Sequence, residues 1–194
     1  MIFNKNKKDN NQNKIIQQVK ENPDNFKKII QVWYRPLYNF IRRISYFEKE
    51  DIEDIIQEVF IKVYKNLNSF DPDLKFSSWI YRITRNQTTD AIRKYKTRPN
   101  TVCLDQQDLA KIFKSSLNLE EEIQNKQDFE VLKRTINEIP YKYREALILR
   151  FIEEKDYKEI MDILKKPKGT VATLLNRGRK KLQKKLKSKN FLNN

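Results

Sequence analysis

The C-terminal segment of the chain combines a strongly basic charge with the apolar spacing of one helix. Residues 163–194 contain eleven Lys or Arg and no Asp or Glu. Apolar positions recur there at helical spacing, and they are Val171, Leu174, Leu175, Leu182 and Leu186. This spacing predicts a helix that begins near Pro167 and buries one apolar stripe. The opposite face then carries small, amide and cationic side chains, which can enter a major groove and contact bases and phosphates.

Two further amphipathic segments precede this helix. Residues 156–164 form a short helix that Asp156 is placed to cap. The break at residues 165–167 is too short for anything but a sharply crossed pair of helices. Residues 141–151 predict another helix, and together the three indicate a helix-turn-helix. A plain three-helix bundle or a solvated basic helix would show similar spacing, so both remain as alternatives.

The composition narrows the classes of partner and chemistry. The chain has 194 residues, a formal net charge of +15 and a pI near 9.7, which favours a polyanionic partner. It contains one cysteine, Cys103, and no histidine, so a disulfide within the chain and the usual zinc sites are excluded. Its two glycines form no phosphate-binding loop. We therefore expect no metal, no cofactor and no catalytic activity.

No apolar run in the sequence approaches the length needed to span a membrane. The N-terminal residues 4–14 are rich in Asn and Lys and lack the apolar core of a signal peptide. These two observations predict a cytoplasmic protein with no membrane contact.

The pattern of charge along the chain predicts an all-α protein with two small helical domains joined by a flexible linker. Residues 99–130 carry a net charge of −4 and show little periodicity, whereas the regions on both sides are strongly helical. The predicted parts are a disordered tail over 1–14, a domain over 15–98, a linker over 99–127, a domain over 128–187 and a tail over 188–194.

The helix expected over residues 50–67 has an unusual outward face for a basic chain. Four residues on adjacent turns of the helix form this face, namely Asp54, Gln57, Glu58 and Ile61. Acidic residues in a first turn can simply complement the helix dipole, but Glu58 lies a turn farther in. A nuclease could instead use Asp51, Asp54 and Glu58 as metal-binding carboxylates. The sequence places no further carboxylate beside them.

The following helix is predicted to begin at Ser77, whose hydroxyl can cap its first turn. An aromatic ring, an amide and two cations share one side of it, namely Trp79, Arg82, Asn86 and Arg93. Unstacked bases need flat partners and their phosphates need positive charge, so this side is a candidate for binding single-stranded nucleic acid. Trp79 and the nearby Phe76 could equally be core residues.

Several motifs resemble those of one protein family. Residues 54–60, 70–72 and 76–86 look like the second region of bacterial sigma factors of the extracytoplasmic-function (ECF) group. Residues 139–146, 157–160 and 169–179 resemble the fourth region of the same proteins. Two independent motifs in the correct order make the resemblance specific.

The resemblance implies a promoter-specificity subunit of RNA polymerase. In similar proteins, the face formed here by Asp54, Gln57, Glu58 and Ile61 docks on the clamp helices of the β′ subunit of core RNA polymerase. The loop and the helix after it bind the melted minus-10 element with one base flipped out, which fits the need to unstack a base before its pairing edge is read. The residues at the matching positions are Phe70, Trp79, Arg82, Asn86 and Arg93.

The helix-turn-helix of such proteins reads the duplex minus-35 element and rests on the β flap. The corresponding positions are Lys168, Thr170, Ala172, Thr173, Asn176, Arg177, Arg179 and Lys180. Ala172 stands where the family usually has a basic residue, so one base contact is lost or becomes apolar contact with a thymine methyl. We expect Asn176 and Arg177 to read bases, and Lys168, Arg179 and Lys180 to contact phosphates.

Two partner questions stay open at this point. Anti-sigma factors commonly accompany proteins of this group, and such a partner is compatible with the sequence. A free-standing helix-turn-helix regulator is the main alternative function, although it leaves the acidic face at residues 54–58 without a purpose.

Overall fold

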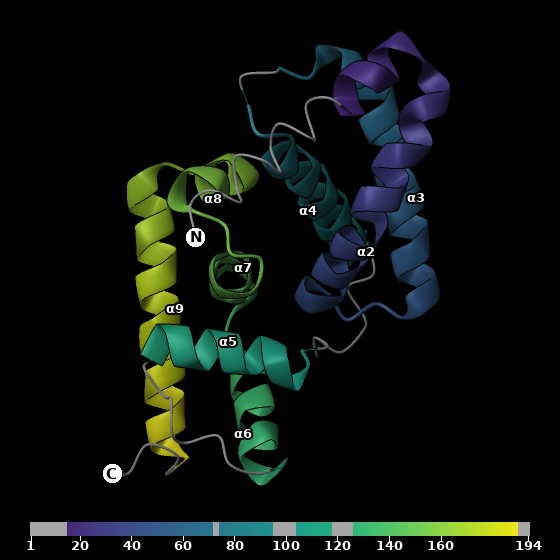
Figure 1. The fold of residues 1–194 in the computed structure, drawn as a ribbon. Helices are drawn as coiled ribbons and strands as arrows, with labels where there is room; N and C mark the ends of the chain where they lie inside the picture. The colour runs from purple at the N-terminus through teal and green to yellow at the C-terminus, as the bar shows by residue number, and fades with distance from the viewer. Residues whose placement is uncertain (1–14, 72–73, 95–103, 118–125, 190–194) are drawn as a thin grey trace. The chain divides into compact units, whose positions relative to one another are not determined.

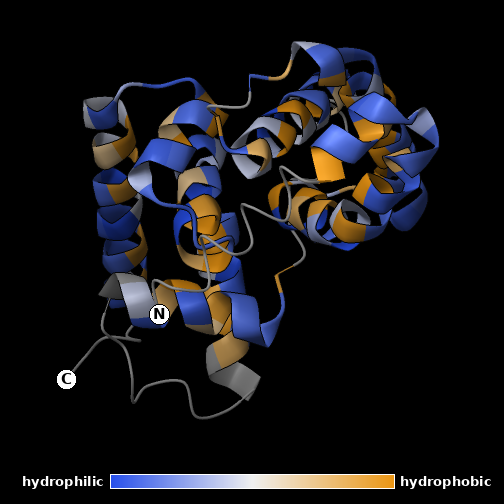
Figure 2. Cartoon of the chain, turned by 45° about the horizontal axis from the view of Figure 1, so that its top comes forward, coloured by the Kyte–Doolittle hydropathy of each residue, from blue (hydrophilic) through white to orange (hydrophobic). Residues whose placement is uncertain are grey.

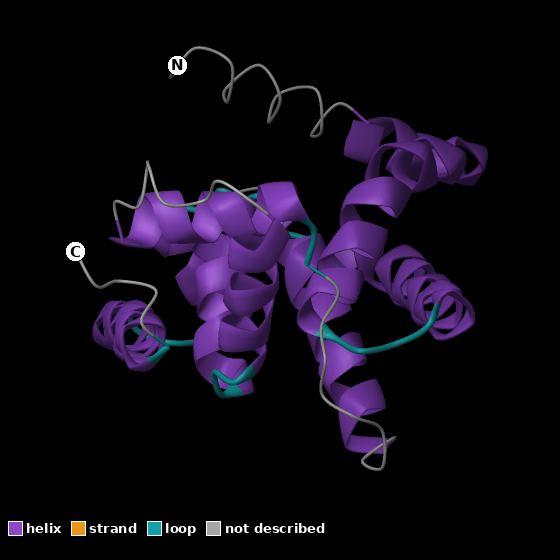
Figure 3. Cartoon of the chain, turned by 90° about the horizontal axis from the view of Figure 1, so that it is seen from below, coloured by secondary structure: helices purple, strands orange, loops and turns teal. Residues whose placement is uncertain are grey.

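The computed structural model describes residues 15–71, 74–94, 104–117 and 126–189 (Figure 1). Every regular element in this part of the chain is helical, which confirms the all-α prediction (Figure 3). Contacts divide the chain into two units, one of residues 1–41 and 47–97 and the other of residues 42–46 and 98–194. The predicted tail over 1–14, most of the tail over 188–194, and Cys103 lie outside the described residues.

The first unit contains helix α2 (Phe26–Ile44) up to residue 41, together with α3 (Lys49–Asn66) and α4 (Phe76–Lys94). A helical segment over 15–21 and the short turn η1 (Pro23–Asn25) precede α2. α2 continues through Pro36, although a proline in a helix removes one backbone hydrogen bond. Its buried side is continuous and consists of Ile29, Trp33, Leu37, Phe40, Ile41 and Ile44.

Helix α3 follows from the spacing of its apolar residues. Its buried positions lie three or four residues apart, and they are Ile52, Ile55, Ile56, Val59, Phe60 and Val63. The first turn carries Glu50 and Asp51, which complement the positive end of the helix dipole. The turn η2 (Leu67–Ser69) ends the helix and buries Leu67. α3 therefore presents one apolar side to α2 and α4 and leaves the opposite side exposed.

The start of α4 differs from the sequence prediction. The helix begins at Phe76, so Ser77 lies inside its first turn and is buried instead of capping it. The backbone oxygen of Lys75 accepts the hydrogen bond from the Trp79 amide at 3.1 Å. Phe76 is 2% exposed, and burying this ring starts the helix one residue earlier.

The second unit contains helices α5 (Gln106–Leu117), α6 (Lys126–Asn137), α7 (Tyr141–Leu147), α8 (Tyr157–Leu164) and α9 (Lys168–Ser188). A π-helical turn, η3 (Ile148–Ile152), extends α7. Hydrophobic residues of these helices lie on sides that face neighbouring helices of the same unit (Figure 2).

Helix α5 lies within the segment predicted as a linker. Its apolar residues Leu109, Ile112 and Phe113 are fully buried, at the spacing of one helical face. Asp105 caps the helix, because its side chain accepts a hydrogen bond from the Asp108 amide at 2.9 Å. α5 packs against η3, α6 and α9. The stretch 106–117 is thus a folded part of the second unit, because three buried apolar side chains outweigh the polar composition around them.

The helix-turn-helix has the predicted local chemistry. Asp156 accepts a hydrogen bond from the Glu159 amide at 2.8 Å, and the Glu159 carboxylate accepts one from the Asp156 amide at 3.0 Å. This pair is a capping box at the start of α8. Lys165 ends α8 in the left-handed conformation with φ 50°, and Pro167 precedes α9. The predicted crossed pair of helices is confirmed.

Helix α9 buries the stripe expected from the sequence and one residue more. Val171, Leu174, Leu175, Leu182 and Leu186 are all buried, and so is Gly178. A Cβ atom at Gly178 would lie 3.2 Å from side-chain atoms of Leu147 in α7. This glycine therefore permits the close packing of α7 on α9.

Candidate functional site

The outward side of α3 carries the predicted acidic face. Asp54, Gln57 and Glu58 are exposed, and the Ile61 side chain is 51% exposed. Positions 54, 57, 58 and 61 lie on one side of the helix because three and four residues complete roughly one turn. This face therefore combines two carboxylates, one amide and one apolar side chain.

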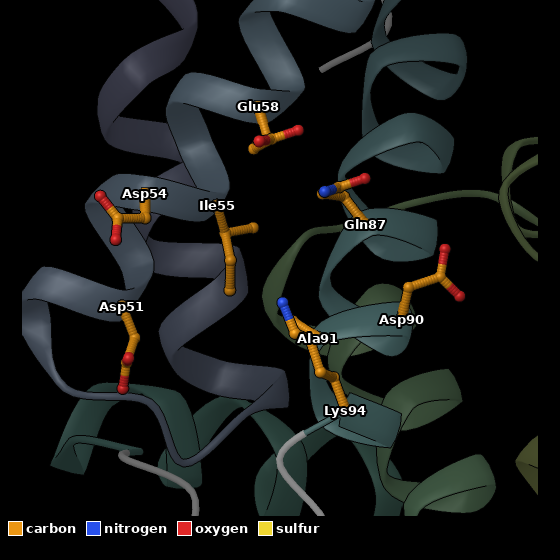
Figure 4. Close-up of a pocket in the computed structure, with 8 residues that line it drawn as sticks. All are labelled: Asp51, Asp54, Ile55, Glu58, Gln87, Asp90, Ala91 and Lys94. Atoms are coloured by element: carbon orange, nitrogen blue, oxygen red, sulfur yellow. The ribbon is translucent and has the colours of Figure 1, made fainter.

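Asp54 and Glu58 also border a cleft between α3 and α4 (Figure 4). The cleft has a volume of about 300 Å³ and is lined by Asp51, Asp54, Ile55, Glu58, Gln87, Asp90, Ala91 and Lys94. Its lining contains four carboxylates and one ammonium group, so the local charge is negative. A cationic side chain of a partner would be favoured there.

The contribution of α4 to this cleft was not predicted from the sequence. Gln87 extends from α4 toward α3, whereas Asp90 borders the cleft with its side chain directed away from α3 (Figure 4). The spacing of Gln87, Asp90, Ala91 and Lys94 could have indicated a shared helix side. No group of three or more His, Cys, Asp or Glu side chains in the described residues is arranged to hold a metal ion, which gives the nuclease alternative no geometric support.

The aromatic residues of the predicted minus-10 site lie in the core of the first unit. Phe70 is 4% exposed and Trp79 is 8% exposed. Their ring centroids are 5.2 Å apart, and the Phe76 ring lies 5.4 Å from Phe70 and 5.5 Å from Trp79. The expectation that Trp79 shares an outward face with the polar residues is therefore wrong. Three large rings gain more from mutual burial than from exposure to water.

The polar residues of the same site remain accessible. Asn86 and Arg93 are exposed, and Arg82 is half-buried. The Asn86 amide oxygen accepts a hydrogen bond from Arg85 at 3.4 Å, and Arg93 pairs with Asp90 at 3.2 Å. The accessible side of α4 thus presents an amide and cations without an exposed aromatic ring.

Helix α9 exposes its predicted contact residues. Asn176, Arg177, Arg179 and Lys180 are exposed, as are Lys168, Thr170 and Thr173, and Ala172 is half-buried. The Thr173 hydroxyl donates a hydrogen bond to the Gly169 carbonyl at 2.8 Å. At 100° per residue, Thr173 and Lys180 lie opposite the buried stripe and are central on the exposed face. Asn176 and Arg177 lie on either side of them.

Arg177 lies to one side of that face. Burial raises the pKa of the Tyr143 phenol in α7, and the nearby guanidinium charge of Arg177 lowers it. The sequence analysis missed Tyr143, because its proximity to α9 depends on how the two helices pack.

None of the helices in the described part of the chain is both long and apolar enough to cross a membrane.

A helical unit with an acidic outward face, together with a second unit that exposes a basic recognition helix, defines a helix-turn-helix protein with a second interaction surface. The comparisons with known proteins identify the family. Sigma-70 region 2 matches residues 29–98, and Sigma-70 region 4 matches residues 129–182. The chain belongs to the ECF group of the sigma-70 family, whose members direct RNA polymerase to promoters.

Individual relatives agree with this assignment. The chain is 34% identical over 183 residues to the ECF RNA polymerase sigma factor SigW of Bacillus subtilis, covering 90% of this chain and 96% of SigW. It is 32% identical over 148 residues to the ECF RNA polymerase sigma-E factor of Escherichia coli K12, covering 73% and 76% of the two chains.

Two solved structures have the same fold. CnrH in complex with the cytosolic domain of CnrY matches with a TM-score of 0.64 and 20% identity, covering 91% of this chain and 97% of that chain. RpoE in complex with the anti-sigma factor NepR from Bartonella quintana matches with a TM-score of 0.61 and 22% identity, covering 84% and 96%.

Proposed function

We propose that this sigma factor uses three separate surfaces to start transcription. The face of α3 binds the β′ clamp helices of core RNA polymerase, the accessible side of α4 binds the melted minus-10 element, and α9 binds the duplex minus-35 element while the helix-turn-helix rests on the β flap. The observation that carries the proposal is the opposite charge of two exposed helix faces, acidic on α3 and basic on α9.

The surface on α3 has the chemistry of a protein-docking site. Asp54, Gln57 and Glu58 supply charge and hydrogen-bonding groups, and Ile61 supplies an apolar contact at the end of the face. Such a mixture binds a partner helix that carries basic and apolar side chains. The same acidic face would repel the phosphates of DNA, so it serves the polymerase and not the promoter.

The minus-10 surface is proposed to use its polar residues for contact and its aromatic residues for support. Asn86 can hydrogen-bond the pairing edge of a flipped base, while Arg82 and Arg93 attract phosphates. Phe70 packs on Trp79 and thereby holds the start of the loop against α4. These buried rings fix the position of the site and do not stack on bases.

On α9, we propose that Asn176 reads a base edge and that Lys168, Arg179 and Lys180 contact phosphates. Asn is a good partner for adenine because it can donate and accept at the major-groove edge. Ala172 and the methyl group of Thr173 offer apolar contact to a thymine methyl. Thr170 lies at the start of α9, where its backbone amide donates a hydrogen bond to the Pro167 carbonyl at 2.9 Å and its exposed hydroxyl can approach a phosphate.

The proposal extends to activity and location. The factor contributes binding energy only, has no catalytic activity of its own, and acts in the cytoplasm, where core polymerase and promoters are found. RpoE from Bartonella quintana is solved in complex with the anti-sigma factor NepR, and we propose an anti-sigma partner for this protein as well.

Run-off transcription tests the proposed function directly. Purified protein is mixed with bacterial core RNA polymerase and a library of genomic fragments, and transcript 5′ ends are mapped. Discrete start sites that need the added protein, with shared upstream elements, are expected. Core polymerase alone is the control. Absence of any protein-dependent start site would overturn the proposal, and tight specific duplex binding without polymerase would favour the free-standing regulator.

A further inference from the structure

Three cations from two helices surround the ring of Tyr143. The Lys142 ammonium lies 5.1 Å from the ring centroid, and the Lys181 ammonium lies 5.7 Å from it. The Arg177 guanidinium lies close enough to the same phenol for its charge to lower the phenol pKa. Lys142 is exposed at the start of α7, and Lys181 and Arg177 are exposed one turn apart on α9. We name these four residues the tyrosine-centred cluster.

The ring makes this gathering of like charges possible. The face of an aromatic ring is electron-rich and attracts ammonium groups within about 6 Å. Tyr143 itself is 7% exposed, so its position is fixed by the packing of α7 on α9. The cluster is therefore a built arrangement and not a set of freely moving surface lysines.

The electrostatic potential at the cluster is positive. Burial alone would raise the pKa of the Tyr143 phenol, but the positive charges of Arg177, Lys142 and Lys181 lower the pKa below its ordinary value of 10.0. α9 contains no Asp or Glu that could neutralise these cations. An anion is thus the expected ligand.

The position of the cluster identifies the anion. At 100° per residue, Arg177 and Lys181 lie on the edge of the exposed face of α9 that is farther from Asn176, so the cluster borders that face along one side. A helix that lies in a major groove has a phosphodiester strand beside each of its sides. We propose that Lys142, Arg177 and Lys181 bind phosphates of the strand beside α9, so that the first turn of α7 also contacts promoter DNA. This inference rests on the proposed role of α9, and it assigns Arg177 to the phosphates instead of the bases.

The salt dependence of DNA binding tests the proposal. The full-length K142Q/K181Q variant is assembled with core polymerase, and its affinity is measured for a labelled promoter duplex taken from the run-off experiment. The same duplex with a scrambled minus-35 element is measured in parallel. Each lost phosphate contact lowers the slope of log K against log salt by about 0.9, so the slope is expected to fall by about 2. The loss of affinity should be equal on both duplexes, because phosphates carry no sequence information.

A matched control is K114Q/K133Q, which removes the same number of charges from α5 and α6. Its slope should stay close to that of the unaltered holoenzyme. An unchanged slope in K142Q/K181Q would overturn the tyrosine-centred site, and so would a loss restricted to the duplex with the intact minus-35 element. Weaker assembly with core polymerase, with DNA binding unchanged, would overturn it in favour of a protein-docking role.

The two proposals can fail separately. If the unaltered holoenzyme shows no preference for the intact minus-35 element, the proposed function of α9 fails, whatever the variant does. If that preference is present and only the variant result is negative, the phosphate site alone fails. Y143F adds a finer test, because it keeps both ring contacts and removes the phenol oxygen near Arg177. We expect the affinity for both duplexes to fall twofold to fivefold. An unchanged affinity would show that Tyr143 is not part of the site.

Discussion

Helices α3 and α9 are built alike on their buried sides and differ on their exposed sides. Each buries a stripe of aliphatic residues at helical spacing, and each leaves the opposite side to water. α3 exposes carboxylates and one isoleucine, whereas α9 exposes amide and cationic side chains without a single carboxylate. The buried stripe determines where a helix lies in its unit. The charge of the exposed side determines which kind of partner it can bind.

Reversing the charge on α3 should have the largest effect. The D54K/E58K variant is expected to bind core polymerase about 100-fold more weakly, because like charges placed across a docking site cost several kcal/mol. The affinity is measured by titrating core polymerase into labelled protein without DNA. E21K/E130K carries the same charge change on exposed positions elsewhere and should bind normally. Equal affinities for both variants would show that the acidic face is not the docking surface.

The next effect concerns the buried side of α9. Gly178→Val places a branched side chain against Leu147, and we expect a loss of about 2 kcal/mol in the free energy of unfolding. Chemical denaturation measures it. Gly169→Ala is the matched control, because no atom lies within 4 Å of the added Cβ. It should be neutral or slightly stabilising. Similar losses in both variants would mean that α7 and α9 do not pack as closely as described.

On the exposed side of α9, Asn176→Ala should change sequence preference more than overall affinity. A bidentate amide contact discriminates by about 1–3 kcal/mol, so we expect about a tenfold loss on the preferred minus-35 element. Lys180→Gln provides the contrast. It should lose the same affinity on every duplex, and its slope of log K against log salt should be lower by about 0.9. Binding to a panel of duplexes with single changes in the element measures both. A uniform loss for Asn176→Ala would show that this residue does not read a base.

The smallest expected effect lies at the end of α9. Glu138 accepts hydrogen bonds from Lys185 and Lys189, each at 2.7 Å, and these bonds lower the pKa of its carboxyl. The carboxylate is 42% exposed, so Glu138→Gln should cost less than about 1 kcal/mol at pH 7.

The pH dependence of the interaction of Glu138 with Lys185 and Lys189 follows from the lowered pKa of the Glu138 carboxyl. Because the folded pKa is lowered, the stabilisation is complete above the ordinary carboxyl pKa of 4.5 and is lost as the pH falls through the folded value. The difference in Tm between Glu138→Gln and the unaltered protein should therefore shrink in acid. E154Q, which removes a more open pair of 3.9 Å with Lys111, should show almost no difference at any pH. A difference for Glu138→Gln that persists at low pH would contradict the assigned cause.

The sequence was sufficient to predict much of both faces. The apolar stripes of α3 and α9 follow from a period of about 3.6 residues, and once a stripe is known the opposite face is known as well. Part of the capping box at Asp156 and Glu159 could be predicted, because Asp is a preferred N-cap residue. These features depend on residues close together in the chain.

Features that depend on contacts between distant residues were predicted less well. Trp79 has the spacing of an outward residue but is buried, because Phe70 and Phe76 pack on it. α5 was assigned to a linker, although Ile112 and Phe113 gain burial from helices that follow much later. The tyrosine-centred cluster joins Lys142 to Lys181, and no local pattern relates residues so far apart.

Gly178 has a consequence for the proposed reading of DNA by α9. A helix is stiff in rotation about its own axis, so the side that rests on α7 and the exposed side turn together. One residue corresponds to 100° of rotation. Contact between Gly178 and Leu147 therefore sets the direction in which Asn176 points. Under the proposed role of α9, a substitution that never touches DNA would then alter promoter choice.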